Sequence, residues 1–348
     1  MMENKKRMVF NVVFLIIIFV GTIYGVFHGK DLSQIADILK TVNPWWLIPG
    51  VLCVFIFIWG ESVIIHYMMQ KLGSKIGRWT CFLFSSVGFF FSCITPSASG
   101  GQPAQIYYMK KRKIPIPVST QVLLIVTITY KMVLVLLGLG IAIFGQNFIH
   151  TYIDDVQWVF YLGLVLNVVC VAGMVLFAFH PSLAKAFVVN GHKLLERMKF
   201  LKHKKSREEK LLASMEKYSQ TADYMKGHAG MLAVVFIITV IQRFSLFAAT
   251  WFVYKAFRLS GSSAWLVIIM QGAIAVAVDM LPLPGGMGIS EKLFMEMFLP
   301  VFGSTLLLPG MILSRGLGYY TELIISALFT IVAHLVIGRN VSGSKTKE

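Results

Sequence analysis

Two segments of the sequence combine proline, glycine and small polar residues in a pattern that can bind an anion. The candidate residues of the first segment, 95–103, are Ser97, Ser99, Gly100, Gly101 and Gln102. Those of the second segment, 281–291, are Gly285, Gly286, Gly288, Ser290 and Glu291. Glycines let backbone N–H groups converge on an anion, and hydroxyl and amide side chains add hydrogen bonds. The pattern favours a cradle for a phosphate; the alternative is two helix breaks that only shape packing.

Charged residues inside apolar runs form a second set of candidates. They are Glu61, Lys131, Arg243, Asp279, Glu291, Arg315 and Glu322. An unpaired charge in hydrocarbon is costly, so such side chains face a protein interior, form ion pairs or line a polar route. Acids and bases are similar in number, so ion pairs between helices are the purely structural interpretation. Three ionisable side chains are expected near the membrane interface, where long side chains reach water: Glu61, His66 and Arg315.

Lys131 and Arg243 differ from the other charged residues because each lies near the middle of its apolar run. Two bases at that depth suit the phosphate of a phospholipid, whereas the acids would hold an amine or a coupling proton. Asp279 precedes the second broken segment and Arg315 follows it. We therefore place these four residues in one candidate site with the two broken segments.

The composition identifies the environment of these residues. Of 348 residues, 57% are hydrophobic and 14% are charged, against roughly 25% charged residues in an ordinary soluble domain. Apolar runs of about 20 residues recur, which is the length of a membrane-spanning helix. These values exclude a disordered chain, a fibrous chain and an ordinary soluble enzyme. They predict an all-α polytopic membrane protein.

The net charge is +16, from 32 Lys and Arg against 16 Asp and Glu. In a membrane protein such an excess marks cytoplasmic loops and contacts with anionic lipid headgroups. We therefore expect no direct binding of nucleic acid by this chain.

We predict six membrane-spanning helices, near residues 8–27, 45–68, 118–144, 158–179, 229–254 and 306–337. Two shorter apolar pieces, 82–95 and 264–281, run into the broken segments. The basic cluster Lys110–Lys113 follows the first break too closely for a return span, which needs about 20 residues. Each piece is therefore predicted to form a re-entrant hairpin, one from each side, as in inverted-repeat transporters. The alternative is eight full spans, which would leave Lys110–Lys113 outside.

Residues 1–340 are expected to form one integral membrane domain, followed by a short polar tail at 341–348. Positive charge predicts that both termini and the basic loop 181–228 are cytoplasmic. Within that loop Leu194, Met198 and Leu201 share one helical face, and Ser206-x-x-Glu209 is a capping-box pattern, so we expect two amphipathic helices, one near 194–201 and one after Ser206. They would lie in the headgroup layer of an anionic leaflet, unless the loop only sets the topology and is solvated.

None of the sequence patterns typical of covalent catalysis is present. The sequence contains no GxSxG, no HExxH, no paired metal-binding aspartates and no ATP-binding glycine loop with lysine. The histidines are scattered without metal-ligand spacing, and the four cysteines form no CxxC pair. We therefore predict no catalytic residues, no metal site and no cofactor.

The two broken segments resemble the motifs of the lysylphosphatidylglycerol synthase transmembrane-region family. TPSASGGQPAQ at 95–105, with the basic stretch after it, is similar to the first motif, and LPLPGGMGISE at 281–291 is similar to the second. The resemblance covers about residues 8–338 and implies a bacterial inner-membrane protein that handles lipids. The residues that it marks as motif positions are Ser97, Gly100, Gly101, Gln102, Gly285, Gly286, Gly288 and Glu291.

The same family includes the membrane domain of the multiple peptide resistance factor, which is similar to a flippase for aminoacylated phosphatidylglycerol. The resemblance thus implies a role in resistance to cationic antimicrobial peptides. In that protein a separate cytosolic domain transfers lysine from lysyl-tRNA to phosphatidylglycerol. This sequence ends at Glu348, soon after its last predicted span, so we expect lysyl transfer only if a separate chain supplies that domain.

The leading hypothesis is a flippase-like translocator of an anionic or aminoacylated phospholipid of the lysyl-phosphatidylglycerol type. The first alternative is a phosphatidylglycerol lysyltransferase or another transferase with a lipid acceptor. The second alternative is an accessory subunit that recruits a synthase through the basic loop. Expected partners are membrane phospholipids and a separately encoded aminoacyl-lipid synthase, whereas the sequence predicts no particular oligomeric state.

Overall fold

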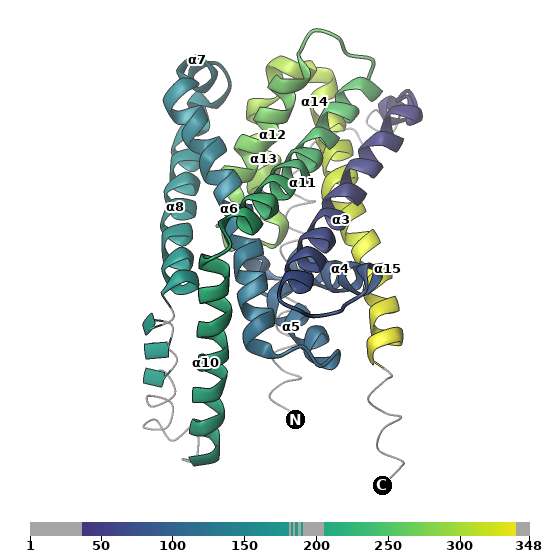
Figure 1. Ribbon diagram of the computed structural model, residues 1–348. Helices are drawn as coiled ribbons and strands as arrows, with labels where there is room; N and C mark the ends of the chain where they lie inside the picture. The colour runs from purple at the N-terminus through teal and green to yellow at the C-terminus, as the bar shows by residue number, and fades with distance from the viewer. Residues whose placement is uncertain (1–36, 181, 184, 187–188, 191–204, 339–348) are drawn as a thin grey trace, which may run out of the picture.

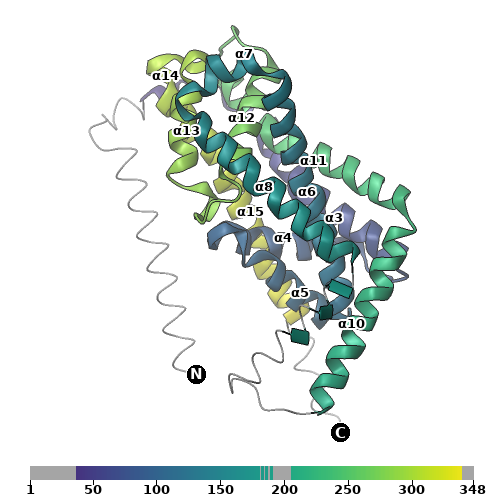
Figure 2. The same ribbon diagram turned by 90° about the vertical axis from the view of Figure 1, so that its left-hand side faces the viewer.

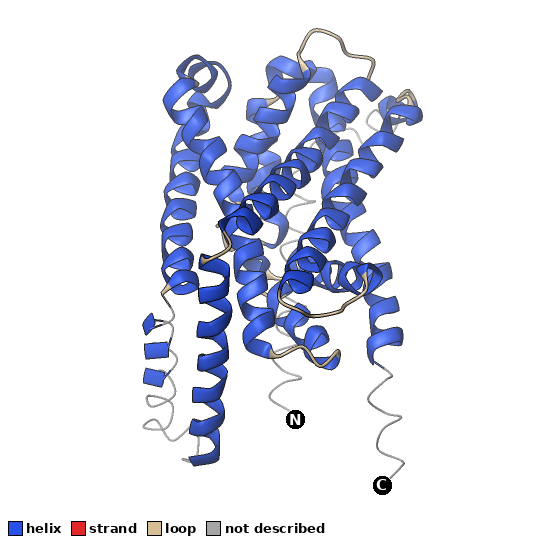
Figure 3. Cartoon of the chain, viewed as in Figure 1, coloured by secondary structure: helices blue, strands red, loops and turns tan. Residues whose placement is uncertain are grey.

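The computed structural model describes residues 37–180, 182–183, 185–186, 189–190 and 205–338, and every regular element in these ranges is a helix (Figures 1 and 3). Five helical stretches are long and apolar enough to cross a membrane: Pro44–Lys71, Ile116–Phe144, Gln146–Phe179, Ala229–Ala256 and Leu299–Ile337. They confirm the predicted all-α polytopic class. The predicted first span, 8–27, and the polar tail, 341–348, lie outside the described residues.

The same order of elements occurs twice along the chain. The first set is α3 (Leu47–Lys71), the short helices α4 (Arg78–Ile94) and α5 (Gly101–Lys111), and the long helix α6 (Ile116–Phe144). The second set is α11 (Ala229–Ala256), the short helices α12 (Ala264–Val278) and α13 (Ile289–Met297), and α14 (Leu299–Arg315), continued by η6 (Gly316–Tyr320) and α15 (Thr321–Ala333). Between the two sets lie α8 (Gln157–Phe179) and α10 (Lys205–Lys226).

Contacts between the helices also repeat when the two sets are exchanged. Helix α3 packs along α11, and the pair α3–α4 has its counterpart in α11–α12. Helix α4 packs on α15, and its counterpart α12 packs on α6. In the same way, α5 packs on α6, and its counterpart α13 packs on α14. Figures 1 and 2 place α4 and α5 toward one end of the molecule and α12 and α13 toward the other. This is the arrangement of the predicted inverted repeat.

Each pair of short helices forms a hairpin whose tip lies inside the molecule. The tips are η2 (Pro96–Ala98) and η5 (Pro284–Gly286), and they pack against each other. Proline cannot donate a backbone hydrogen bond, so Pro96 and Pro284 suit the point where a helix stops. The apolar helices α4 and α12, with 17 and 15 residues, are too short to count as spans. The described structure therefore agrees with two hairpins rather than eight full spans.

Two buried apolar cores hold these hairpins. One is built around α3, α4, α5 and α6 and includes Met68 and Phe84. The other is built around α11, α12, α13 and α14 with α8, and in it Phe294 and Phe298 stack with ring centroids 4.2 Å apart. Each hairpin is thus fixed by its own core, and the tips meet between the two cores.

Helix α10 differs from the predicted amphipathic helix in what it contacts. Its residues Met215, Tyr218 and Met225 are buried, and it packs against α6, α8 and α11. The hydroxyl of Tyr218 donates to the carbonyl of Phe177 at 3.0 Å. One face of α10 is therefore attached to the bundle and is not free for a headgroup layer. The companion helix expected near 194–201 lies outside the described residues.

Candidate functional site

A cavity of about 530 Å³ lies where the two hairpin tips meet. This volume is in the range of small-molecule and cofactor sites. Its walls come from both breaks and from residues of α3, α4, α5, α6, α8, α11, α12, α13, α14, η6 and α15. The charged side chains in the lining are Glu61, Lys131, Arg243, Asp279, Arg315 and Glu322.

The polar lining follows the helical period on each long helix. On α6 the lining residues are Leu123, Val126, Thr127, Tyr130 and Lys131, which recur at intervals of three and four. Residues at this spacing share one face of a helix. The face of α6 that points into the cavity therefore becomes more polar from Leu123 toward Lys131.

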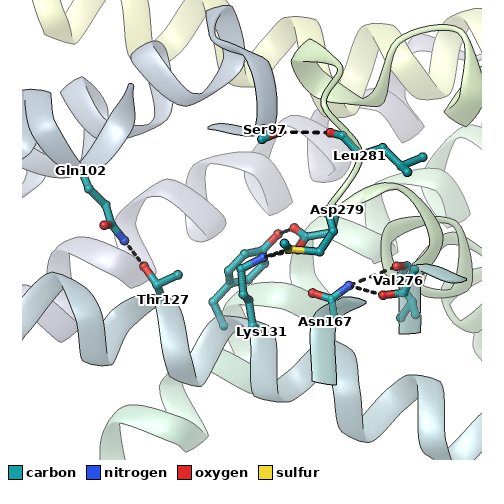
Figure 4. A network of polar contacts seen from close by, with 11 residues as sticks. Ser97, Gln102, Thr127, Lys131, Asn167, Val276, Asp279 and Leu281 are labelled. Atoms are coloured by element: carbon teal, nitrogen blue, oxygen red, sulfur yellow. Dashed lines mark hydrogen bonds and ion pairs between the residues drawn. The ribbon is translucent and has the colours of Figure 1, made fainter. Parts of the chain in front are cut away.

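Lys131 is neutralised by the second hairpin. Its Nζ lies 2.5 Å from Oδ2 of Asp279, and the hydroxyl of Tyr130 donates to Oδ1 of the same carboxylate. Figure 4 shows the side chains of Lys131 and Asp279 pointing toward one another. These contacts tie α6 to the end of α12, so Lys131 is held by a carboxylate and does not present a free charge to a ligand.

Arg315, at the end of α14, is neutralised by Glu291, which belongs to the second hairpin and follows its break. Its Nε lies 2.9 Å from Oε1 of Glu291, and its Nη2 donates to the carbonyl of Gly285 at 3.0 Å. The second oxygen of Glu291 accepts from the N–H of Gly288 at 2.7 Å and from Ser290 Oγ at 3.0 Å. Glu291 thus caps α13 and fixes Arg315, and it is not part of the cavity lining.

Backbone N–H groups of the glycines form hydrogen bonds within the two breaks. The N–H of Gly100 donates to Thr95 Oγ1 at 2.9 Å, and the N–H of Gly286 donates to the carbonyl of Leu283 at 3.1 Å. With Gly288 bonded to Glu291, three of the expected donors are already used. These three N–H groups are therefore not free to converge on an anion. Gly101 instead permits close packing, since a Cβ there would lie 2.7 Å from the carbonyl of Gly88.

The first break contributes polar side chains to the cavity. Ser97, Ser99 and Gln102 all belong to its lining. Ser97 Oγ donates to the carbonyl of Leu281 at 3.4 Å, and the amide of Gln102 donates to Thr127 (Figure 4). In the second break Gly285, Gly286 and Ser290 also line the cavity, whereas Gly100, Gly101 and Gly288 do not.

Arg243 is the base of the cavity that has no carboxylate of its own. Its side chain is 8% exposed, its Nε has no hydrogen-bond partner, and among the described residues it forms no ion pair. Its guanidinium carbon lies 4.0 Å from the ring centroid of Tyr130, with Phe57 at 5.2 Å. Aromatic faces stabilise a cation without neutralising it. Of the two bases predicted near the middle of their spans, Lys131 is therefore neutralised, whereas Arg243 keeps a charge that no described residue neutralises through an ion pair.

Two further acids complete the polar wall; the sequence marks both as charges within apolar runs, but neither belongs to the predicted site with the two broken segments. Oε1 of Glu61 accepts from the amide of Gln105 at 2.6 Å, and Oε1 of Glu322 accepts from the thiol of Cys93 at 3.4 Å. Both acids line the cavity. Arg315, Tyr319 and Glu322 recur at i, i+4 and i+7, so the helical period of an otherwise apolar stretch could have placed Glu322 beside Arg315.

Glu61 and Arg315, which were expected near the membrane interface, both face the internal cavity. His66 is not in the lining, and its Nδ1 is buried without a partner. In the part of the chain that the structure describes, no group of three His, Cys, Asp or Glu residues could hold a metal ion, and all four cysteines are free.

Together these features define a class: a polytopic α-helical membrane protein with a charged cavity between the tips of two broken hairpins. The family model of the lysylphosphatidylglycerol synthase TM region matches residues 9–326. The chain belongs to this family, as the two motifs predict, and the family supports a lipid-related role in a membrane. A comparison with curated proteins finds no match.

Proposed function

We propose that this protein moves phospholipids across the membrane by passing the headgroup through the cavity while the acyl chains stay in the bilayer. The observation that carries the proposal is the buried guanidinium of Arg243, which forms no ion pair with any carboxylate of residues 37–180 and 205–338. A buried charge without a partner is costly. A guanidinium binds a phosphate through two parallel hydrogen bonds, so the phosphate of a lipid would supply the missing partner.

The remaining polar groups suit the rest of a headgroup. Ser97, Ser99 and Gln102 offer hydrogen bonds on the side of the first break. Glu61 and Glu322 offer negative charge that an amine would balance. We therefore infer an anionic or aminoacylated phospholipid as the substrate, with lysyl-phosphatidylglycerol as the aminoacylated type that the family name supports. Lys131, Asp279, Arg315 and Glu291 would shape the site through their ion pairs.

A phosphatidylglycerol lysyltransferase is the second candidate, and the name of the family favours it. Lysyl-tRNA is a polyanion, and proteins bind such molecules through extended basic surfaces. The bases of the cavity are two neutralised side chains and Arg243, which suits one phosphate better. A separate synthase beside this chain would reconcile both candidates. Formation of labelled lysyl-lipid from lysyl-tRNA by the purified chain alone would establish the transferase.

For the cellular setting we infer the inner membrane of a bacterium, with α10 and both termini on the cytoplasmic side. The support is the basic excess of residues 181–228, since positive loops stay in the cytoplasm. A translocator of aminoacylated lipid in that membrane would make its outer leaflet less negative. Such a change would lower the attraction of cationic peptides, which is the basis for proposing a role in resistance to them.

The proposal is tested by reconstituting the protein in vesicles with headgroup-labelled phosphatidylglycerol and following how fast the label becomes accessible to an impermeant quencher. We expect faster exposure than in protein-free vesicles. Arg243→Met should slow it roughly 10- to 100-fold, since charged hydrogen bonds contribute about 1.5–3 kcal/mol. Arg112→Met, which removes an exposed arginine, is the matched control and should behave as wild type. Failure to accelerate phosphatidylglycerol or lysyl-phosphatidylglycerol would contradict the proposal.

A further inference from the structure

The charges around the hairpin tips do not balance. In the part of the chain that the structure describes, the bases there are Lys131, Arg243 and Arg315, and the acids are Glu61, Asp279, Glu291 and Glu322. Two acids are used in the ion pairs Lys131–Asp279 and Arg315–Glu291. Glu61 and Glu322 are left with one common cation, Arg243. Full ionisation would therefore leave one uncompensated negative charge in a cavity inside the protein.

The positions of the two acids make them a pair. Glu61 belongs to α3 and Glu322 to α15, and these helices pack against each other. The two carboxyl groups interact electrostatically with each other and with Arg243. Their own hydrogen bonds come from neutral donors, the amide of Gln105 and the thiol of Cys93. Neither acid therefore has a cation that it does not share.

The other ionisable groups on the elements packed around this pair do not supply the missing positive charge. Helix α4 contributes the thiol of Cys93, and η6 contributes the phenol of Tyr319. From α14, Arg315 interacts with Glu322, but it is held by Glu291. From α6, Lys131 and Tyr130 are both bonded to Asp279. Helix α5 contributes the neutral amides of Gln102 and Gln105 to the cavity lining.

We propose that Glu61 and Glu322 form a proton-binding site next to the Arg243 anion site, and that lipid movement is coupled to this proton. The proposal rests on the proposed function, because the lipid phosphate is the ligand to which the proton responds. Two carboxylates that share one cation repel each other, so one of them holds a proton more readily than an isolated carboxylate would. The buried Arg243, with no partner of its own, is the group through which a ligand acts on both acids.

The direction of coupling follows from charge. When an anionic phosphate binds Arg243, it neutralises the cation that the two acids share. A proton then passes from a hydronium ion to a carboxylate oxygen, which gives a carboxylic acid and a water molecule. Phosphatidylglycerol should thus bind with proton uptake, and its affinity should fall as pH rises. The ammonium groups of lysyl-phosphatidylglycerol can lie against the same carboxylates, so this lipid should take up fewer protons.

The first test detects the proton without any transport. Infrared spectra of the purified protein at neutral pH should contain the carbonyl stretch of a buried protonated carboxyl group. The band should disappear or shift in Glu61→Gln and in Glu322→Gln. It should remain in Glu296→Gln, which changes an exposed acid on α13. A spectrum without the band, or a band that both cavity variants leave unchanged, would overturn the proton site even if the protein moves lipid.

The second test uses the vesicle assay with labelled phosphatidylglycerol and a pH gradient. Entry of the lipid from the acidic side should be several-fold faster than without the gradient, and this response should be lost in Glu61→Gln and Glu322→Gln but kept in Glu296→Gln. Lipid movement that ignores the gradient in wild type would overturn the coupling and leave the translocator intact. An infrared band without lipid movement under any condition would support the proton site and reject the proposed function.

Discussion

The two broken segments occupy equivalent places in the repeat but are held in different ways. In the first break, Ser97 and Ala98 adopt φ values of 51° and 53°, which cost free energy for any residue with a side chain. In the second, glycines take the positive φ values, at Gly285 (56°) and Gly286 (65°). Pro284 and Gly286 are buried, whereas the serine-rich turn of the first break is largely exposed to the cavity.

Charge differs between the breaks as well. Asp279, just before the second break, forms an ion pair with Lys131, and Glu291, at the end of this break, forms an ion pair with Arg315. The first break has no ion pair among the described residues and is linked to the second by one long hydrogen bond, from Ser97 to Leu281. The comparison indicates that the second break is a fixed frame, whereas the first presents polar groups to the cavity. This division leaves Arg243 available between them.

The strongest test of the fixed frame is Glu291→Ala. The change leaves the partly buried Arg315 without its carboxylate and removes the cap of α13. We expect a loss of about 3 kcal/mol in the free energy of unfolding, since breaking a buried pair by removing one partner is strongly destabilising. Chemical unfolding in detergent measures it. Glu296→Ala, on the exposed side of the same helix, is the control; equal losses in both variants would rule out a special role for the pair.

Gly285→Ala should come next. A Cβ at this position would lie 2.2 Å from the ring of Tyr319, at a φ that already disfavours alanine. Strain and overpacking together should cost about 2–3 kcal/mol. Gly303→Ala separates the two causes, because Gly303 has a φ of 68° but open space around it. We expect thermal unfolding to show a clearly smaller loss for Gly303→Ala, and a similar loss would mean that the ring contact is unimportant.

Tyr319→Phe tests the contact that joins the two breaks. The ring of Tyr319 lies against Gly285, and its hydroxyl donates to the carbonyl of Cys93 at 2.9 Å, just before the first break. Removing this hydroxyl should cost about 1 kcal/mol of unfolding free energy. The hydroxyl of Tyr320 forms no hydrogen bond with a described residue, so Tyr320→Phe should be close to neutral. The reverse order of the two effects would contradict the bridging role.

The smallest expected effect has the opposite sign. Ala98→Gly relieves a positive φ of 53° in the first break and should raise the free energy of unfolding by about 0.5 kcal/mol, after the entropy gained by the unfolded chain is subtracted. Ala104→Gly inside α5 is the control and should lower it by about 1 kcal/mol. If both variants were destabilised alike, the first break would be no more strained than an ordinary helix.

Most of the fold could be predicted from the sequence because it depends on length and hydropathy. The spans near 45–68, 118–144 and 229–254 match helices whose ends differ by only a few residues. The hairpins were predictable because Lys110–Lys113 follows the first break too closely for another span. The helices that α10 contacts could not be predicted, because an amphipathic face indicates burial against some apolar surface but does not identify that surface.

The site was predictable only in part. Arg243 and Asp279 could be placed because a charge deep in an apolar run must face a polar interior. That Glu61 and Arg315 line the cavity could not be predicted, because the cavity is enclosed by hairpin tips whose meeting point hydropathy does not show. The glycine N–H groups were overvalued because their donors are used within the turns, at Gly100 and Gly288 for example. Such bonds depend on backbone angles that a motif does not specify.

The most direct test of the central claim is an experimental structure of the protein in a bilayer that contains phosphatidylglycerol. We predict a lipid phosphate between the two hairpin tips, with its oxygens about 2.8 Å from the guanidinium of Arg243 and the pairs Lys131–Asp279 and Arg315–Glu291 intact. A structure in which Arg243 is ion-paired to Glu61 or Glu322 and the cavity holds no phosphate would contradict the account.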